Sequence, residues 1–429
     1  MSLHGAPSDP SGARHALSGR GYWQPRFGRL SLAVGISSLG DPISLTLSQF
    51  LLYRATHSAF ALAGIYLSQI AAGLLVGLFA GSVADRLDRR SLVGTLELGR
   101  AVVVALLPVT TLISPLTLYP ALFLVGGVEA IVQPARLAGV PGLVGSDQVE
   151  RASASLLLLS ALGQAAGFAM AGVLIAMLPD PRVLFLIDAV TFAVAGLLVI
   201  TVGPLGGGVT KVKLSGAVFR ALASPRLRPH LLVAGVVALF TNMLAPSLLP
   251  LSYVLSGNGV TVYAWLQVLL ILGATLGSLI AFRTGAAPSV LAMALWLFAL
   301  GVLGAGLAHT FWLTGVAIGI SAIGNALYFI ANQSTLLKAA DERNRGSVMS
   351  ARYSVVQICR VLGLGAGAAI TSATSGMLTF TITGILLLLV AAFVTRWWLQ
   401  ARAQPRASRG DPRTPPSDRL SEGASQPEP

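Results

Sequence analysis

Residues 81–90, "GSVADRLDRR", place five charged side chains in six successive positions of a chain that is otherwise strongly apolar. Of the 429 residues, 54% are hydrophobic and only 10% are charged, and the mean hydropathy is +0.77. Soluble domains carry about 25% charged residues, so this composition is typical of a polytopic membrane protein. The charged stretch therefore marks a point at which the chain leaves the apolar part of a bilayer.

Apolar runs of about 20 residues, the length needed to cross a bilayer, recur along the whole chain. We count twelve, separated by short polar breaks. We therefore expect an all-α integral membrane protein with twelve transmembrane helices in two six-helix bundles. The runs lie near residues 30–52, 59–83, 91–113, 117–139, 151–178, 183–203, 230–255, 261–283, 288–308, 311–336, 347–370 and 375–398.

The longest internal break is expected to form a cytoplasmic linker with a short interfacial helix, because apolar and basic residues alternate there at helical spacing. The two halves also resemble each other: Asp147–Arg151 follows span four, and Asp341–Arg345 has the same spacing after span ten. Parallel six-helix repeats are a known membrane-protein architecture. The predicted segments are a cytoplasmic N-terminal segment 1–28, a bundle 29–203, the linker 204–228, a bundle 229–399 and a disordered cytoplasmic tail 400–429.

Basic residues are concentrated before the first span, in the even-numbered gaps and in the tail, whereas the odd-numbered gaps hold only Arg54 and Arg182. The positive-inside rule then places both termini in the cytoplasm of a multi-pass protein of the inner (plasma) membrane. The net charge of +13 is thus a topology signal, and we expect no nucleic-acid partner. One cysteine and five scattered histidines predict neither a disulfide nor a metal site.

The stretch 81–90 resembles the signature loop between helices two and three of the major facilitator superfamily, G-x-x-x-D-R-x-x-R-R. It matches this pattern at Gly81, Asp85, Arg86, Arg89 and Arg90. Asp88 stands where many members have glycine, and we expect it to occupy the left-handed turn that glycine would adopt.

The resemblance implies that this loop locks the two bundles together on the cytoplasmic side. A plain topology anchor would explain the arginines but not Asp85, which directly follows an apolar span and is costly there without a partner. The carboxylate of Asp85 can accept from the N-terminal amides of a facing helix, and span eleven, starting near Gly346, is the expected partner.

Other stretches are similar to the exporter branch that includes bacterial macrolide-efflux and enterobactin-exporter proteins. They are "SSLGDPISLTLSQFLLYRATHSAFALAG" (37–64), "LELGRA" (96–101), "QPARLAGVPGLVGSDQVERASA" (133–154) and "AVFRALASPRLRPHLL" (217–232). Unlike wider drug–proton antiporters, span four lacks an early arginine, and span five has Gly167-Phe168 in place of Gly-Pro. The candidate motif of helices four and five consists of Pro134, Arg136, Gly163, Gly167 and Gly172.

Ionisable residues inside spans are costly and are usually functional. Asp41 lies near the middle of span one, next to Pro42, and Glu129 lies at similar depth in span four. In the major facilitator fold, helices one, four, seven and ten line the central cavity. The resemblance therefore makes Asp41 and Glu129 the candidate proton-coupling residues.

The remaining intramembrane charges have other expected roles. Glu97 and Arg100 are three residues apart and are expected to neutralise each other, and Asp188 is expected to be structural. Arg360 in span eleven stays open: it is a counter-ion, an anchor for an anionic substrate, or a partner of a backbone carbonyl. Polar side chains of the cavity wall, or alternatively of interhelical hydrogen bonds, are Gln49, Asn242, Asn325, Tyr328, Asn332 and Gln333.

The function expected from this resemblance is secondary active export of an amphipathic small organic molecule, such as a drug, antibiotic, siderophore or secondary metabolite, by proton antiport. The protein is expected to be monomeric and not an enzyme, with no cofactor and the proton as coupling ion. A nutrient importer on the same fold is the main alternative, and a membrane enzyme acting on lipid is a more distant one. A nucleotide-driven pump is disfavoured because no G-x-x-x-x-G-K-[ST] motif occurs.

The alternation of basic residues gives a first prediction. A reporter enzyme that is active only outside the cytoplasm should stay inactive when fused after residue 403, and should become active when fused in the break near Arg182. Activity of the C-terminal fusion would contradict the predicted even number of spans or the predicted orientation.

Overall fold

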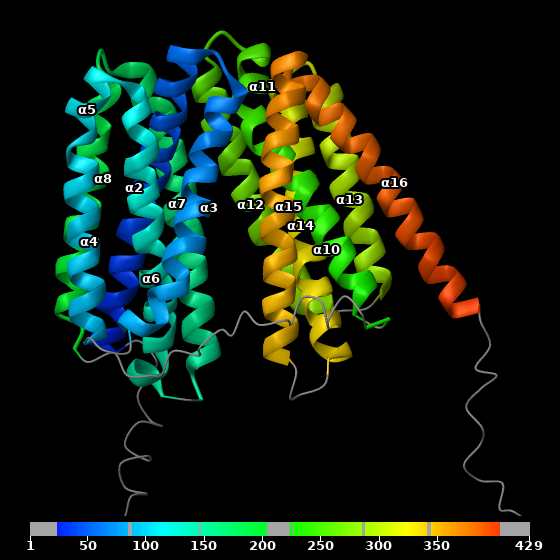
Figure 1. Cartoon of the computed structure of the whole chain (residues 1–429), viewed down its shortest axis with the longest axis horizontal. Helices are drawn as coiled ribbons and strands as arrows, with labels where there is room; N and C mark the ends of the chain where they lie inside the picture. The colour runs from blue at the N-terminus through cyan, green and yellow to red at the C-terminus, as the bar shows by residue number, and fades with distance from the viewer. Residues whose placement is uncertain are drawn as a thin grey trace, which may run out of the picture.

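Long helices stand side by side in two bundles (Figure 1). The computed structural model describes residues 24–84, 88–145, 147–203, 224–225, 227–284, 288–340 and 345–403. Most of the predicted N-terminal segment, linker and tail lies outside the described residues, so their boundaries and the interfacial helix stay predictions.

The described part of the chain is helical throughout, and each bundle is built from one half of the sequence. The first bundle contains α2 (Pro25–Thr56), α3 (Ala59–Ala84), α4 (Arg89–Ala105), α5 (Leu107–Ile113), α6 (Leu118–Val144), α7 (Val149–Met177) and α8 (Leu184–Ile200), with the short 3-10 turns η1 (Pro115–Thr117) and η2 (Pro181–Val183). The second contains α10 (Arg228–Leu244), α11 (Leu248–Leu255), α12 (Gly259–Thr284), α13 (Pro288–Leu307), α14 (Phe311–Ala339), α15 (Arg345–Ala373) and α16 (Gly376–Ala403), with the 3-10 turn η3 (Ala245–Ser247).

Twelve of the described segments are long and apolar enough to span a membrane, so the predicted fold class is confirmed. The third span is interrupted between α4 and α5 at Pro108, and the seventh between α10 and α11 at Pro246, because proline has no amide hydrogen to donate to the preceding turn. The first span begins at Pro25 instead of residue 30, since a helix continues past the apolar run that the sequence marks.

Close packing within the first bundle depends on glycines of α7. A side chain at Gly163 or Gly167 would collide with the backbone carbonyl oxygens of Gly35 and Leu39 on α2. Small residues at helix interfaces let backbones approach closely, which is the main source of helix association in lipid. The two helices therefore pack as one unit.

The second bundle repeats this contact. Gly363 and Gly367 of α15 face the carbonyl oxygens of Leu239 and Met243 on α10. The same glycine spacing thus joins the fifth helix to the first in each half of the chain.

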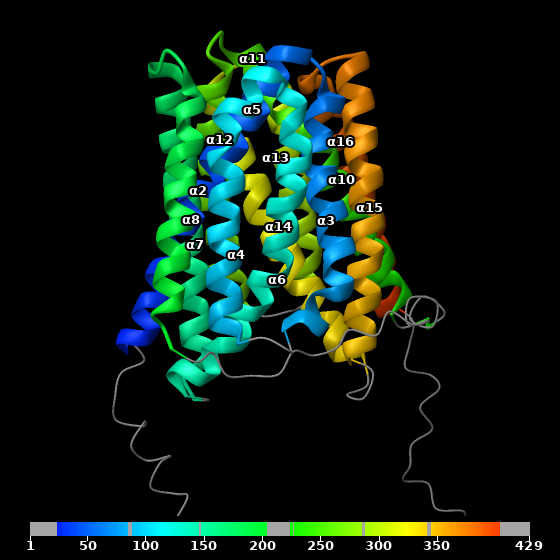
Figure 2. The same ribbon diagram turned by 60° about the vertical axis from the view of Figure 1, so that its left-hand side comes forward.

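The bundles contact each other mainly at the end opposite to the one where α2 begins and α16 ends, which is the upper end in Figure 1. There Thr261 Oγ1 of α12 donates to the carbonyl oxygen of Gly172 on α7 (2.8 Å), and Ala264 packs on the same glycine. On the other side, α3 lies beside α15, as Figure 2 also shows. Apolar residues fill this second contact: Ala59, Ala63, Ile70, Leu364 and Ala368.

The glycines of α15 offer a matched pair of substitutions. Gly367→Ala should lower the apparent unfolding temperature of the purified protein, because the methyl group would be forced against the backbone of α10. Gly365→Ala, where a methyl group meets nothing within 4 Å, should leave stability unchanged or raise it by up to about 1 kcal/mol through helix propensity. Equal effects of the two substitutions would contradict the packing described here.

Candidate functional site

A cavity of about 570 Å³ lies on the side of the first bundle that is turned toward α15. Its wall is formed by residues of helices α2 to α8, with three residues of α15. The volume lies within the range of small-molecule binding pockets. The charged residues of the wall are Asp41, Arg100, Glu129, Arg136, Asp188 and Arg360.

Arg100 of α4 is the centre of the charges in the first bundle. Its Nη2 lies 2.9 Å from Asp41 Oδ1 on α2, and its Nη1 lies 2.8 Å from Glu129 Oε2 on α6. Its side chain is only 2% exposed, and the guanidinium lies 4.0 Å from the ring centroid of Phe192. One buried cation therefore holds two carboxylates from different helices.

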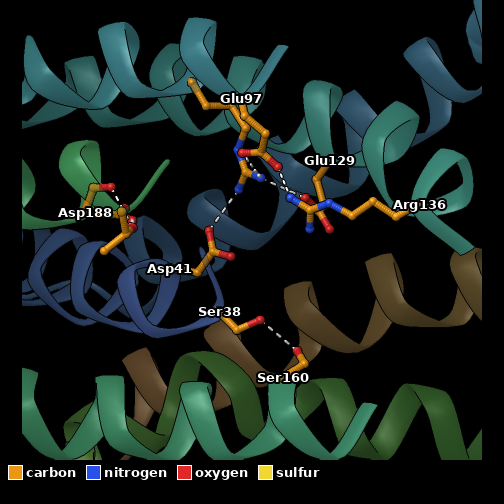
Figure 3. A network of polar contacts seen from close by, with 9 residues as sticks. Ser38, Asp41, Glu97, Glu129, Arg136, Ser160 and Asp188 are labelled. Atoms are coloured by element: carbon orange, nitrogen blue, oxygen red, sulfur yellow. Dashed lines mark hydrogen bonds and ion pairs between the residues drawn. The ribbon is translucent and has the colours of Figure 1, made fainter. Parts of the chain in front are cut away.

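Glu97 extends this cluster on its buried side. The carboxylate of Glu97 lies 3.4 Å from Arg100 Nη1 and also pairs with the guanidinium of Arg136 from α6. Glu97 is fully buried, so its charge is balanced by the two arginines and not by water. Figure 3 shows Glu97, Glu129 and Arg136 close together, with Asp41 across from them.

Asp188 of α8 lies beside the cluster but makes no ion pair in the described part of the chain. It is 1% exposed and accepts a hydrogen bond from Thr191 Oγ1 (3.2 Å). A side chain at Gly40 would collide with its carboxylate, so Asp188 packs directly on α2, one residue from Asp41.

The carboxylates are far more exposed to the cavity than the cation between them. The side chains of Asp41 and Glu129 are 44% and 37% exposed, whereas Arg100 is buried behind them. A proton or an ammonium group in the cavity therefore meets carboxylate oxygens first.

Comparisons with solved structures identify the architecture. The nucleoside transporter NupG has a TM-score of 0.73 at 13% identity, with 87% of this chain and 99% of that chain covered. A bacterial homolog of the human lysosomal transporter Spinster, in an inward-facing and unoccupied conformation, has a TM-score of 0.68 at 16% identity, with 90% and 100% covered. The peptide transporter PepTSo of the POT family has a TM-score of 0.66 at 12% identity, with 89% and 99% covered. This chain has the major facilitator fold.

The sequence comparison agrees with this fold. The profile of the Major Facilitator Superfamily matches residues 231–426, which lie in the second half of the chain. No curated protein matched the sequence. The similarity to the exporter branch stays a prediction.

Of the candidate site residues, Asp41, Glu129 and Arg360 line the cavity. Arg360 Nε donates to Asn242 Oδ1 (3.3 Å) and its Nη1 donates to Gln357 Oε1 (2.9 Å). Its partners in the described residues are therefore side-chain amides, and not the carboxylates or backbone carbonyl considered from the sequence.

Other predicted cavity residues lie elsewhere. Gln49 is buried between the bundles, where its Nε2 donates to the hydroxyls of Tyr66 (2.9 Å) and Tyr263 (2.8 Å). Tyr328 and Asn332 of α14 are buried, and Asn332 Nδ2 donates to the carbonyl oxygen of His230 on α10 (3.3 Å).

The described wall of the cavity contains no residue of α10 or α14, so Asn242 and Asn325 are not part of it either. Of the four helices expected to line it, only the first and the fourth do so among the described residues.

The residues of the candidate motif of helices four and five make different contacts. Arg136 joins the charge cluster, and Pro134 lies inside α6. Gly163 and Gly167 pack on α2, whereas Gly172 packs on α12 in the other bundle.

The signature loop is described only in part. Asp85 and Arg86 lie outside the described residues, Arg89 is described by its backbone alone, and Gly81 lies in the last turn of α3. The latch therefore stays a prediction.

The expectation for Asp88 is wrong. Its φ is −60°, so it does not adopt a left-handed turn. Instead it is the N-cap of α4, where Oδ2 accepts from the backbone amide (3.2 Å) and the hydroxyl (3.1 Å) of Ser91, and Arg90 lies 3.7 Å away.

Sequence reasoning missed the contacts of Arg100 and Arg136. We paired Arg100 with Glu97 because they are close in sequence, but the shorter contacts of Arg100 go to Asp41 and Glu129. The sequence does contain a signal for these contacts. Acidic residues occur inside four of the spans, and very few basic residues are available inside the spans to pair with them.

Replacing the central cation tests the cluster. Arg100→Gln should destabilise the protein by about 3–5 kcal/mol, because it leaves buried carboxylates without their counter-charge. The measurement is thermal unfolding of the purified protein. The control is Arg54→Gln, which removes an exposed arginine at the end of α2 and should change little.

A second substitution makes this test specific. Adding Asp41→Asn to Arg100→Gln should recover part of the loss, since one unbalanced charge is removed. Additive destabilisation in the double variant would show that Arg100 does not act through this carboxylate.

Proposed function

We propose that this protein is a secondary active transporter that exports an amphipathic small organic molecule by alternating access in exchange for protons. The observation that carries the proposal is the buried Arg100, held between two carboxylates that face a cavity of drug-sized volume. The named activities of the similar structures, which are nucleoside and peptide transporters, support transport as the general class.

The contacts between the bundles support alternating access. The bundles are joined at the end away from the termini, by Gly172 against α12 and by Gln49 between Tyr66 and Tyr263. With both termini in the cytoplasm, these contacts close the outer side. A second state then requires breaking them while new contacts form at the cytoplasmic end.

The charge balance of the cluster supports proton coupling. Among the described residues, the carboxylates of Asp41, Glu97 and Glu129 pair with Arg100 or Arg136, and the carboxylate of Asp188 beside them has no ion pair. Full ionisation would leave two negative charges unbalanced within the membrane, which is strongly unfavourable. Binding of protons by the cluster would therefore remove this unfavourable charge. Asp41 and Glu129 are the carboxylates of the cluster that are most exposed to the cavity.

Asp41 is the proposed principal coupling residue. Protonation neutralises its carboxylate and weakens its ion pair with Arg100, which leaves the guanidinium paired with Glu129 and Glu97. Pro42, inside α2, removes a backbone hydrogen bond directly beside this switch and gives the helix a place to bend.

The direction of transport separates the main proposal from its alternative. A solute importer would use the same fold and the same carboxylates for symport. Uptake into inside-out vesicles under a proton gradient, compared with uptake into whole cells, distinguishes the two. The solute itself is to be found by comparing the metabolites exported with and without the protein.

Neutralising the coupling residue gives the decisive prediction. Asp41→Asn should abolish uphill, proton-driven transport while leaving substrate binding and downhill exchange partly intact, because the side chain keeps its size but no longer titrates. Glu129→Gln should weaken transport less. Both are measured in proteoliposomes with an imposed pH gradient.

The matched control is Glu150→Gln, which removes an exposed carboxylate in the first turn of α7, outside the cavity. It should transport like the wild type. Uphill transport by Asp41→Asn with unchanged pH dependence would place the coupling site elsewhere.

A further inference from the structure

The two bundles differ in the sign of their interior charge. All four interior carboxylates belong to the first bundle. In the sequence from residue 229 to residue 403, the only acidic residues are Asp341 and Glu342, which lie between α14 and α15, so the spans of the second bundle contain none. Yet α15 carries two arginines inside the span, Arg352 and Arg360.

These two arginines have different surroundings. Arg352 is 7% exposed and its guanidinium lies 4.4 Å from the ring centroid of Phe329, so its charge is stabilised partly by an aromatic face. Arg360 lines the cavity instead. Its hydrogen-bond partners, Asn242 and Gln357, are neutral amides, and no carboxylate of the described residues is within ion-pair distance.

Asn242 and Gln357 also fix the position of Arg360. Asn242 Nδ2 donates to the carbonyl oxygen of Ala238, which orients its Oδ1 toward Arg360 Nε. Gln357 lies one turn before Arg360 on the same face of α15 and is 7% exposed. The guanidinium is therefore held in place by neutral groups while its charge stays uncompensated.

The opposite wall of the cavity has the complementary charge. Asp41 and Glu129 expose their carboxylates there, and their common counter-ion is buried. Apolar side chains form much of the remaining wall, among them Leu137, Leu157 and Phe168. The cavity thus has an anionic wall on one bundle and a cationic group on the other, and apolar side chains line it together with serines and glutamines.

We propose that the cavity binds zwitterionic amphiphiles, with an ammonium group at Asp41 and Glu129 and a carboxylate or phosphate at Arg360. This inference rests on the proposed function only in taking the cavity as the substrate site. A solute with a cation alone leaves Arg360 without a counter-ion, and a solute with an anion alone lacks a partner on the carboxylate wall. A zwitterion satisfies both walls and links the two bundles through its own body.

Matched probes test this inference on the full-length protein in lipid nanodiscs. The probes are ω-amino fatty acids of three chain lengths, with the alkylamine and the fatty acid of each length, and empty nanodiscs correct for partition into lipid. Equilibrium binding is measured at one pH without any gradient. At the best chain length, the ω-amino acid should bind at least ~10-fold more tightly than either single-charge probe, since each end forms a charge-assisted contact.

Substitutions assign the two ends. Arg360→Gln should reduce the affinity for the ω-amino acid to that of the alkylamine and leave the alkylamine unaffected. Asp41→Asn should reduce it toward that of the fatty acid. Arg283→Gln, which removes an exposed arginine near the end of α12, is the control and should bind like the wild type.

Three results would overturn the inference. They are equal binding of alkylamine and ω-amino acid by the wild type, an equal loss of all probes in Arg360→Gln, and no ω-amino acid binding at any length. Wild-type preference that Arg360→Gln leaves intact would instead indicate that Arg360 serves the carboxylates of the first bundle when the cavity closes. Because no gradient is applied, these outcomes are independent of the transport test on Asp41.

Discussion

The first bundle depends on one buried guanidinium. Arg100 connects α4 to α2 through Asp41 and to α6 through Glu129, and it shares Glu97 with Arg136. Because a charge inside a membrane must be compensated by its neighbours, these contacts fix the positions of three helices at once. The same contacts leave the carboxylates of Asp41 and Glu129 at the cavity surface. The ion pairs that stabilise the bundle are therefore also exposed to any charged group that enters the cavity.

Glycine contacts join the first and fifth helices of each bundle, together with a few polar contacts. Gly163 and Gly167 bring α7 against α2, and the hydroxyls of Ser38 and Ser160 share a hydrogen bond at the same interface (2.9 Å). Gly363 and Gly367 bring α15 against α10, where Arg360 donates to Asn242. Each pair can therefore move as a rigid body. Further polar groups lie where the two bundles meet, as the placement of Gln49 between two tyrosines illustrates.

The fold was predictable from the sequence because each span carries its own signal, a run of about 20 apolar residues. The candidate site was predictable only in part. Asp41 and Glu129 stand out as acids in apolar spans, but their pairing with Arg100 joins residues 59 and 29 positions apart and has no local signature. Polar residues such as Gln49 and Asn332 carry no sign of whether they face a cavity or another helix, and the N-cap role of Asp88 depends on where α4 begins.

The contact of Gly172 with Ala264 and Thr261 joins the bundles through very small side chains. If the two bundles rotate about this contact, its small side chains have almost no rotamers to change between the two states. The activation barrier between the two states then comes from the hydrogen bonds and ion pairs that are exchanged at the two ends of the bundles. Repacking of side chains at the contact of Gly172 adds little to it. In a protein built in this way, the rate of exchange between the two states would be set by polar groups far from the axis of rotation.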